Sequence, residues 1–228
     1  MLEDLKDRVC QANLELVRQN LVSLTFGNAS GLDRQNGLVV IKPSGVAYES
    51  LAPRNLAVVR LADGAAVEGG RPSSDAPAHL ALYRAFGRIG GVVHTHSPWA
   101  TAWAQAGREI PVLGTTHADH FFGPIPCTRP LRAEEIADRY EARTGEAIVE
   151  RLAGLDPLCM PAALVAGHGP FAWGPTPEAA VENAVVLELV ARLACQTLGL
   201  APQAGPLDQD LLAKHFLRKH GPDAYYGQ

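Results

Sequence analysis

The sequence predicts a single domain of the α/β or α+β class, in which helices and strands alternate along the chain. Long segments carry apolar residues at spacings of three and four, as amphipathic helices do. Short β-branched runs bounded by Gly, Asn and Asp lie between them, as strands do. The 228 residues are 47% hydrophobic and 19% charged, which is enough for one sizeable core. No repeat or linker divides them, so we expect one domain over residues 1–228.

The first half of the chain begins with a helix. Its apolar residues recur at spacings of three and four, namely at Leu2, Leu5, Val9, Ala12 and Leu16. Three strands are expected next, within residues 21–27, 37–45 and 56–64. A helix over 76–86, a strand over 89–96 and a helix over 98–107 follow.

The second half begins with a helical pattern over residues 133–154, which we expect to break near Gly145. Residues 161–174 predict two strands joined by a turn at residues 167–169. A last helix is expected over 207–221.

The longest helical pattern covers residues 176–199, with Thr176 as its N-cap and Pro177 at its first position. Because its apolar residues cover more than one stripe, we expect this helix to be largely buried. Glu188 and Arg192 interrupt its most apolar part, which is too short to span a bilayer.

The overall charge argues against nucleic acid and membrane partners, since the net charge is −4 and the pI is near 6.1. The N-terminus is charged from its third residue, so no signal peptide is visible. Four cysteines lie far apart without a C-x-x-C motif, which indicates reduced thiols in or near the core. We therefore expect a cytoplasmic protein.

His94 and His96 lie one residue apart at the end of a β-branched run. Residues i and i+2 of a strand point to the same face, so both imidazoles could bind one metal. The alternative is a pair of hydrogen-bonded surface histidines. His168, between two glycines, and Asp75 are further candidate ligands. Alternatively, His168 could be an ordinary turn residue, and Asp75 could be a helix N-cap before Pro77.

Three short loops look suited to an anion, because Gly, Ser and Asn leave backbone N–H groups and hydroxyls unobstructed. Their sequences are TFGNASG, KPSG and PSSD. Each alone could be a plain hairpin turn.

Two further features stand out, an aspartate in a loop and a pair of tyrosines near the C-terminus. Asp119 precedes two phenylalanines, so its carboxylate could lie beside an apolar wall, or it could be a solvated loop residue. Tyr225 and Tyr226 lie in the last four residues. Because chain ends are usually poorly ordered, an ordered tail here would need contacts that hold it.

Together these motifs resemble the class II aldolase/adducin family along essentially the whole chain, from MLEDLK through HTH, GTTHAD and HGPFAWG to AYYGQ. GTTHAD and the YYGQ end resemble the branch that epimerises L-ribulose 5-phosphate. The resemblance implies a three-layer α/β/α fold with a mainly antiparallel central sheet. It also implies a C4 homotetramer with active sites at subunit interfaces. His120 departs from the family pattern, because related enzymes tend to carry an aromatic residue there.

The resemblance also assigns roles to residues. The zinc ligands it implies are Asp75, His94, His96 and His168. The phosphate site it implies consists of Gly27, Asn28, Ser44, Gly45, Ser73 and Ser74. Asp119 and Tyr226 would be the acid–base pair, with Tyr226 and His215 reaching the zinc site of a neighbouring subunit. A phenol is a weak acid, so cations such as His215 and Arg218 would be needed to stabilise its anion. Their alternative role is to complement a helix dipole.

The implied function is a zinc-dependent epimerase that interconverts L-ribulose 5-phosphate and D-xylulose 5-phosphate. It would cleave the bond between carbons 3 and 4 and re-form it on the other face of the aldehyde, although another divalent metal could replace zinc. The enzyme could serve arabinose or ascorbate breakdown. One alternative is a sugar-phosphate aldolase, similar to fuculose-phosphate aldolase, that releases its aldehyde. Another is an adducin-like interaction domain without activity, which the retained histidines and acid–base candidates argue against.

Overall fold

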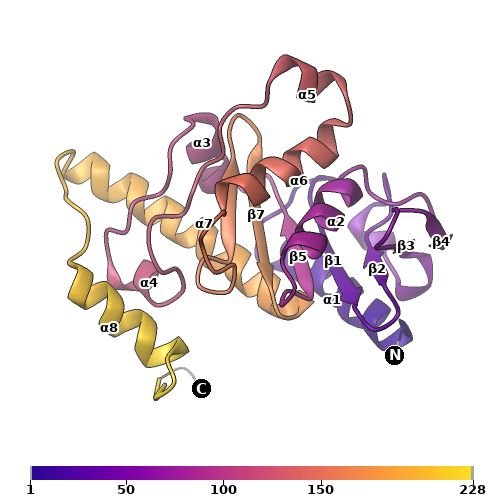
Figure 1. Ribbon diagram of the computed structural model, residues 1–228, viewed down its shortest axis with the longest axis horizontal. Coiled ribbons are helices and arrows are strands. Elements are labelled where there is room, and N and C mark those ends of the chain that lie inside the picture. Colours follow the sequence, from indigo (N-terminus) through magenta and orange to yellow (C-terminus); the bar gives the residue numbers. More distant parts are fainter. Residues whose placement is uncertain (1, 227–228) are drawn as a thin grey trace.

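The computed structural model describes residues 2–226 and shows a seven-stranded sheet between two layers of helices (Figure 1). The strand order is β4-β3-β2-β1-β5-β7-β6, and every pairing between these strands is antiparallel. The strands are β1 (Asn28–Asp33), β2 (Leu38–Ile41), β3 (Ala57–Arg60), β4 (Ala66–Glu68), β5 (Gly91–His94), β6 (Ala162–Val165) and β7 (Gly169–Gly174). The expected α/β fold with a mainly antiparallel sheet is confirmed.

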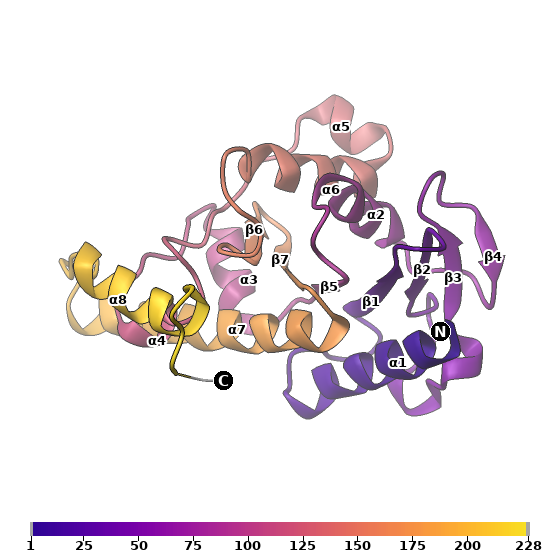
Figure 2. The ribbon, with the colours of Figure 1, turned by 60° about the horizontal axis from the view of Figure 1, so that its bottom comes forward.

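Helices cover both faces of this sheet. They are α1 (Leu2–Arg18), α2 (Ala76–Ala85), α3 (Pro98–Gln105), α4 (Thr115–Ala118), α5 (Ala133–Ala137), α6 (Tyr140–Arg151), α7 (Pro177–Leu200) and α8 (Gln209–His220). Two short 3₁₀ turns, Tyr48–Ser50 and Pro53–Asn55, precede β3. In Figure 2, α1 and α7 lie below the strands, and α2 and α6 lie above them. The sequence predicted all of the longer helices, but missed α4 and β4.

The central strand β1 was not predicted where it lies. Residues 21–27, which we expected to be a strand, form a turn in which Leu24 has a left-handed φ of 55°. The strand begins at Asn28 instead, in a polar sequence with low strand propensity. It is stable because its polar side chains are paired: the Ser30 hydroxyl lies 2.7 Å from Nδ1 of His79 and 2.9 Å from the Tyr83 hydroxyl.

The helical region 133–154 breaks earlier than expected. Its two helices are separated at Asp138 and Arg139, where Arg139 has a left-handed φ of 55°. Gly145 lies inside α6, in contact with α2. A Cβ at Gly145 would lie 2.7 Å from Cβ of Ala81 and 2.8 Å from the Ala78 carbonyl oxygen. The glycine therefore allows close helix packing rather than a break.

The long helix α7 begins as predicted, since the Thr176 hydroxyl accepts a hydrogen bond from the Ala179 amide. Our expectation that it would be largely buried is wrong for the single chain. Leu189 is 37% exposed and Leu193 39%, because only the stripe that faces the sheet is covered. Its bounds, Pro177–Leu200, agree with the predicted range to within one residue at each end. By length and composition it could cross a membrane, a test that core helices also pass.

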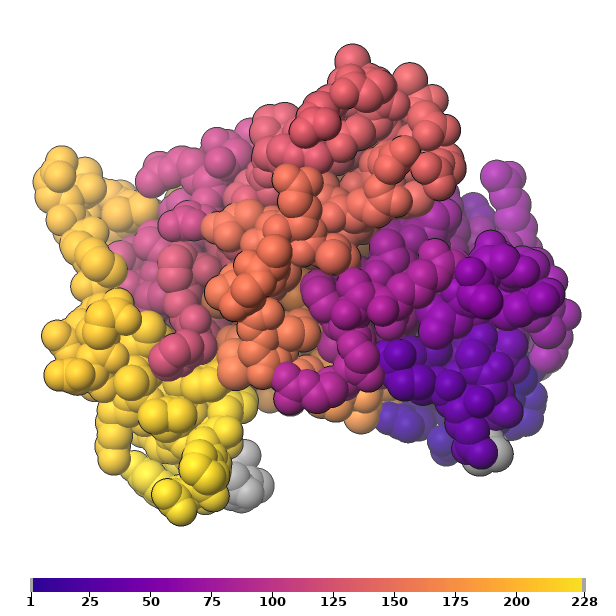
Figure 3. All heavy atoms as spheres, viewed as in Figure 1, coloured from indigo at the N-terminus to yellow at the C-terminus, as the bar shows by residue number. Residues whose placement is uncertain are grey.

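The C-terminal helix α8 lies at the end of the molecule away from β1–β4, together with α4 (Figures 1 and 2). In the space-filling view the yellow region that contains α8 projects from the body of the molecule (Figure 3). The four cysteines are free, as expected, but Cys195 is exposed rather than near the core.

Candidate functional site

Three histidines converge beside the ends of β5 and β7. Their nearest ring nitrogens all lie within 4.8 Å of one another, in a group formed by His94, His96 and His168. Strand register explains this meeting: β5 pairs antiparallel with β7, so the last residue of β5 lies beside the turn that begins β7. His96 lies beyond the end of β5, so the strand alternation expected for the H-x-H motif ends before it. The ring centroids of His94 and His96 are still only 5.0 Å apart.

His94 is buried and held from two sides. Its Nδ1 lies 3.0 Å from the Pro170 carbonyl oxygen, to which it donates a hydrogen bond in the tautomer that leaves Nε2 free. Its ring stacks on Phe171 with a centroid distance of 4.2 Å. Burial lowers the pKa of His94 to about 3, although the Asp75 carboxylate opposes this shift. His94 is therefore neutral at pH 7, as a metal ligand must be.

The donor set fits a divalent metal. Burial and the nearby His96 lower the pKa of His168, so this imidazole is also neutral. Three imidazole groups whose nearest ring nitrogens lie within 4.8 Å of one another match the ligands of catalytic zinc sites, which leave one position open.

Asp75 lies at the N-cap position of α2, but its side chain makes no capping hydrogen bond. Its Oδ2 accepts hydrogen bonds from Nδ2 of Asn28 at 2.7 Å and from the Ser73 hydroxyl at 3.4 Å. Burial raises the pKa of Asp75, but the charges of His94 and His79 and the Asn28 hydrogen bond outweigh it, and the net pKa is lowered. The carboxylate is thus ionised and lines the same cavity as His94 and His96. Among residues 2–226, the group of possible metal ligands consists of the three histidines and does not include Asp75.

All six expected phosphate residues line one cavity of about 260 Å³ together with part of the metal group. We call this the histidine cavity; its lining is Thr25, Phe26, Gly27, Asn28, Lys42, Pro43, Ser44, Gly45, Ser73, Ser74, Asp75, His94 and His96. Register again explains the arrangement, because Asn28 of β1 lies opposite His94 of β5. Gly27 is required where it stands, since its φ is 77° and a Cβ would lie 2.9 Å from the His94 carbonyl oxygen.

Lys42 is a cavity residue that sequence reasoning missed. Its side chain is buried, and its ammonium lies 4.8 Å from the centroid of the Tyr48 ring. No carboxylate within residues 2–226 forms an ion pair with it, and burial lowers its pKa. A buried cation without a protein counter-ion, beside hydroxyls and glycines, suits an anionic ligand. The available signal was its position as the first residue of the KPSG loop, which we expected to bind an anion without assigning a role to the lysine.

The acid–base candidates form a second group on α4 and α8, which we call the Asp119 cluster: Asp119, His215, Arg218 and Tyr226. Both Asp119 oxygens accept hydrogen bonds from Nη2 of Arg218 at 3.0 Å, and Nδ1 of His215 lies 3.0 Å from Oδ1. The Tyr226 amide donates to the Arg218 carbonyl oxygen at 3.1 Å, and the Arg218 guanidinium lies 4.1 Å from the centroid of the Tyr226 ring. These contacts order the tail.

The structure does not bring the two groups together within one chain. None of the four residues of the Asp119 cluster lines the histidine cavity. The departure at position 120 lies next to the cluster, with Nε2 of His120 3.2 Å from Nζ of Lys219. Burial, followed by the Lys219 charge, lowers the pKa of His120.

Known proteins share both the sequence and the fold. A family model described as the class II aldolase and adducin N-terminal domain matches residues 7–195. "L-ribulose-5-phosphate 4-epimerase UlaF" of Salmonella paratyphi C is 56% identical over 228 residues, which is 100% of both chains. A protein of the same name from Salmonella typhi is also 56% identical over 100% of both chains.

Among solved structures, an L-fuculose 1-phosphate aldolase has a TM-score of 0.78 at 23% identity, over 93% of this chain and 94% of that one. YgbL from Klebsiella pneumoniae, described as a putative aldolase/epimerase/decarboxylase, has a TM-score of 0.73 at 27% identity. It matches over 94% of this chain and 98% of that one. From the full-length sequence matches and the shared fold, the chain belongs to the class II aldolase and adducin family.

Proposed function

We propose that this chain is a metal-dependent epimerase that interconverts L-ribulose 5-phosphate and D-xylulose 5-phosphate. The observation that carries the proposal is the histidine cavity, which is lined by two of the three clustered histidines together with the amide and hydroxyl donors expected to bind a phosphate. The full-length relatives that carry this activity in their names support the choice of substrate.

Each part of the cavity has a role in binding. Asn28, Ser44, Ser73 and Ser74, with the amides of Gly27 and Gly45, would bind the phosphate, and Lys42 would balance its charge. His94, His96 and His168 would hold a divalent metal, which we propose to be zinc, with Asp75 as a further ligand. When bound, the metal would supply a Lewis acid to the sugar oxygens at carbons 2 and 3.

The chemistry needs a proton transfer on each face of an aldehyde. The proton at carbon 4 is not acidic, because this carbon is not adjacent to the ketone. Cleavage between carbons 3 and 4 avoids that problem: a base removes the proton from the carbon 4 hydroxyl, and the electron pair stays with the three-carbon fragment. The cavity keeps the glycolaldehyde phosphate while its aldehyde rotates. Re-addition on the other face then needs an acid, so Asp119 and Tyr226 would serve one face each.

Because the Asp119 cluster and the histidine cavity are separate in one chain, we propose that a neighbouring subunit supplies the cluster. Asp119 is tied to Arg218 and His215 of its own chain, so it would reach the neighbour's cavity together with Tyr226. A homotetramer with active sites at its interfaces would meet this need. It would also cover exposed apolar residues such as Phe122, at 47%, and Leu217, at 52%.

A direct assay tests the proposed activity. Metal-loaded protein incubated with L-ribulose 5-phosphate should form D-xylulose 5-phosphate without net release of glycolaldehyde phosphate. Stoichiometric release of that aldehyde would identify an aldolase instead, the alternative that the fold of L-fuculose 1-phosphate aldolase keeps open. Absence of both reactions in a metal-loaded protein would exclude the proposal.

The proposal also covers organisation and location. We propose one catalytic domain over residues 1–228, acting in the cytoplasm on a small phosphorylated pentulose in arabinose or ascorbate breakdown. Nucleic acid and membrane partners are not part of it, since the net charge is −4. α7 packs along β5 and β7 as part of the domain.

A further inference from the structure

The phenol of Tyr140 contacts the histidine group, although none of the roles above involves it. Its hydroxyl lies 3.3 Å from Nδ1 of His168, and the two ring centroids are 6.1 Å apart with 30° between the ring planes. Tyr140 is the half-buried first residue of α6.

The three histidines are held to different degrees. His94 is fixed by the Pro170 carbonyl oxygen and by stacking on Phe171. His168 lies in a turn after Gly167, which has a φ of 73°. Within residues 2–226, the Tyr140 hydroxyl is the one side-chain or backbone group that forms a hydrogen bond with the His168 ring. The His168 ring also lies close to the rings of His94 and His96, with centroid distances of 4.8 and 5.0 Å, but among the described residues this hydrogen bond is the contact that can select its tautomer.

We infer that Tyr140 is a positioning residue for His168: its oxygen accepts a hydrogen bond from Nδ1–H and thereby directs Nε2 at the metal. The inference rests on the proposed function, since it requires the histidine group to bind a metal. A metal-binding imidazole coordinates through one nitrogen and donates the other N–H to a fixed acceptor, which selects the tautomer and the ring orientation. For His94 that acceptor is a backbone carbonyl oxygen, and for His168 it is the phenol.

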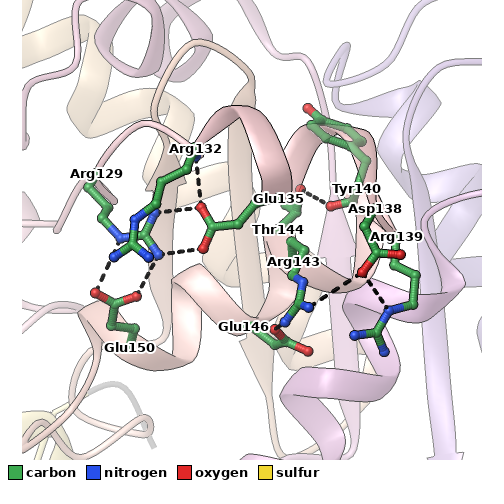
Figure 4. Close-up of polar contacts among 10 residues, drawn as sticks. All are labelled: Arg129, Arg132, Glu135, Asp138, Arg139, Tyr140, Arg143, Thr144, Glu146 and Glu150. Carbon is green, nitrogen blue, oxygen red and sulfur yellow. Dashed lines mark hydrogen bonds and ion pairs between the residues drawn. The ribbon is translucent and has the colours of Figure 1, made fainter.

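The start of α6 is built to hold the phenol in place (Figure 4). The Thr144 hydroxyl donates to the Tyr140 carbonyl oxygen at 3.0 Å. Just before the helix, the Asp138 carboxylate accepts hydrogen bonds from Nε of Arg139 at 3.3 Å and from Nη2 of Arg143 at 3.5 Å.

A second set of ion pairs ties α5 to α6. Arg129 pairs through Nη1 with Glu135 at 2.7 Å and through Nη2 with Glu150 at 2.9 Å. Gly145 lets α6 pack closely on α2. Tyr140 thus stands on a helix that is fixed at several points, as a positioning residue requires.

The test compares zinc affinity in three full-length proteins: wild type, Tyr140→Phe and Thr144→Val. Tyr140→Phe removes one oxygen and keeps the ring, whereas Thr144→Val disturbs the same helical turn and keeps the phenol. Competition with a chromogenic chelator should show zinc binding weakened about 10- to 100-fold in Tyr140→Phe, as for other residues that orient a ligand. Thr144→Val should stay close to wild type. The absorption spectrum of the cobalt-loaded protein should change in Tyr140→Phe alone, and the melting temperatures of the metal-free proteins should show that Tyr140→Phe remains folded.

Two results would overturn the inference without touching the proposed function. One is wild-type zinc affinity and an unchanged cobalt spectrum in Tyr140→Phe. The other is an equal loss of affinity in Thr144→Val, which would show that the helix start matters rather than the hydroxyl. If the wild-type protein itself binds no divalent metal, the inference and the proposed metal-dependent function both fail.

Discussion

The histidine cavity and the Asp119 cluster differ in what holds their side chains. The cavity is built on neighbouring strands, where backbone register sets Asn28 opposite His94 and brings His168 beside them. The Asp119 cluster joins two helices through charged side chains, with Arg218 99 residues away from Asp119 in the chain. Backbone register survives the loss of any one side chain, whereas a side-chain cluster depends on each of its members. A substitution in the cavity should therefore remove the function of that side chain and leave the others in place, whereas a substitution in the Asp119 cluster should also disturb its partners.

The largest effect is expected from removing a metal ligand. His96→Asn should abolish stoichiometric zinc binding and nearly all activity, because two remaining histidines are a poor site. His96 is exposed, so the protein should stay folded. Metal analysis and circular dichroism of the purified variant check this. Full zinc content in the variant would show that the histidine group is not the metal site.

Asp119→Asn should reduce interconversion by orders of magnitude while zinc content stays at the wild-type level. The variant keeps the size of the side chain but removes the charge that pairs with Arg218 and His215. Slow leakage of glycolaldehyde phosphate would indicate that cleavage continues from one face. Loss of zinc together with activity would contradict the separation of the two groups.

Asn28→Ala should mainly weaken substrate binding. The side chain is expected to donate to the phosphate, and it also donates to Asp75 at 2.7 Å. Each hydrogen bond lost to a charged group costs roughly 1.5–3 kcal/mol, so KM for L-ribulose 5-phosphate should rise about ten- to over a hundredfold. Steady-state kinetics measures it, with Asn36→Ala on an exposed turn as control. An unchanged KM would remove Asn28 from the phosphate site.

Mixed tetramers test whether the two groups meet between chains. Neither Tyr226→Phe nor His94→Asn should be active alone. Co-refolding equal amounts should restore up to about a quarter of wild-type activity, because each site needs an intact cavity from one chain and an intact tyrosine from another. Native mass spectrometry confirms the exchange. Exchange without recovered activity would show that Tyr226 does not serve a neighbouring cavity.

The smallest effect is expected on the pH dependence of stability, through His117 in α4, the helix that Asp119 follows. Burial lowers the pKa of His117 in α4 from its ordinary 6.5 to about 4. The unfolded chain therefore binds a proton at a higher pH than the folded protein, so this histidine costs no stability above pH 6.5 and destabilises the fold progressively as the pH falls towards 4.

From 1.36 kcal/mol per pH unit, the loss attributable to His117 between pH 7 and pH 5 is about 2 kcal/mol. His117→Gln keeps a donor for the Gly123 carbonyl oxygen and should lose less stability over this range. Urea unfolding at both pH values measures the difference. Equal losses in the variant and the wild type would mean that other groups govern the acid sensitivity.

The fold could be predicted where local pattern and environment agree. Residues 38–41 and 91–94 are rich in β-branched residues and mostly buried, and the helices carry periodic apolar residues, so these elements lie where expected. β1 was not predicted, because its stability comes from residues far away in the chain: the Ser30 hydroxyl, for example, contacts His79 and Tyr83. The helix break expected at Gly145 was wrong for a related reason: the glycine is needed because Ala78 and Ala81 of α2 pack against it.

For the candidate site, the sequence by itself determined which functional side chains are present. It supplied the histidines, the carboxylates and the glycine-rich loops, since residue types and short spacings are local properties. Only the tertiary structure decided which of them meet. Strand pairing placed the phosphate loops beside His94 and His96. The folded structure also shows that Asp75 accepts a hydrogen bond from Asn28 instead of capping α2, and that Lys42 lines the cavity. It also placed Asp119 in contact with His215 and Arg218 of α8, away from the cavity that His94 and His96 line. Such groupings depend on contacts between residues far apart in the chain, which packing of the whole sheet and its helices creates and no local pattern encodes.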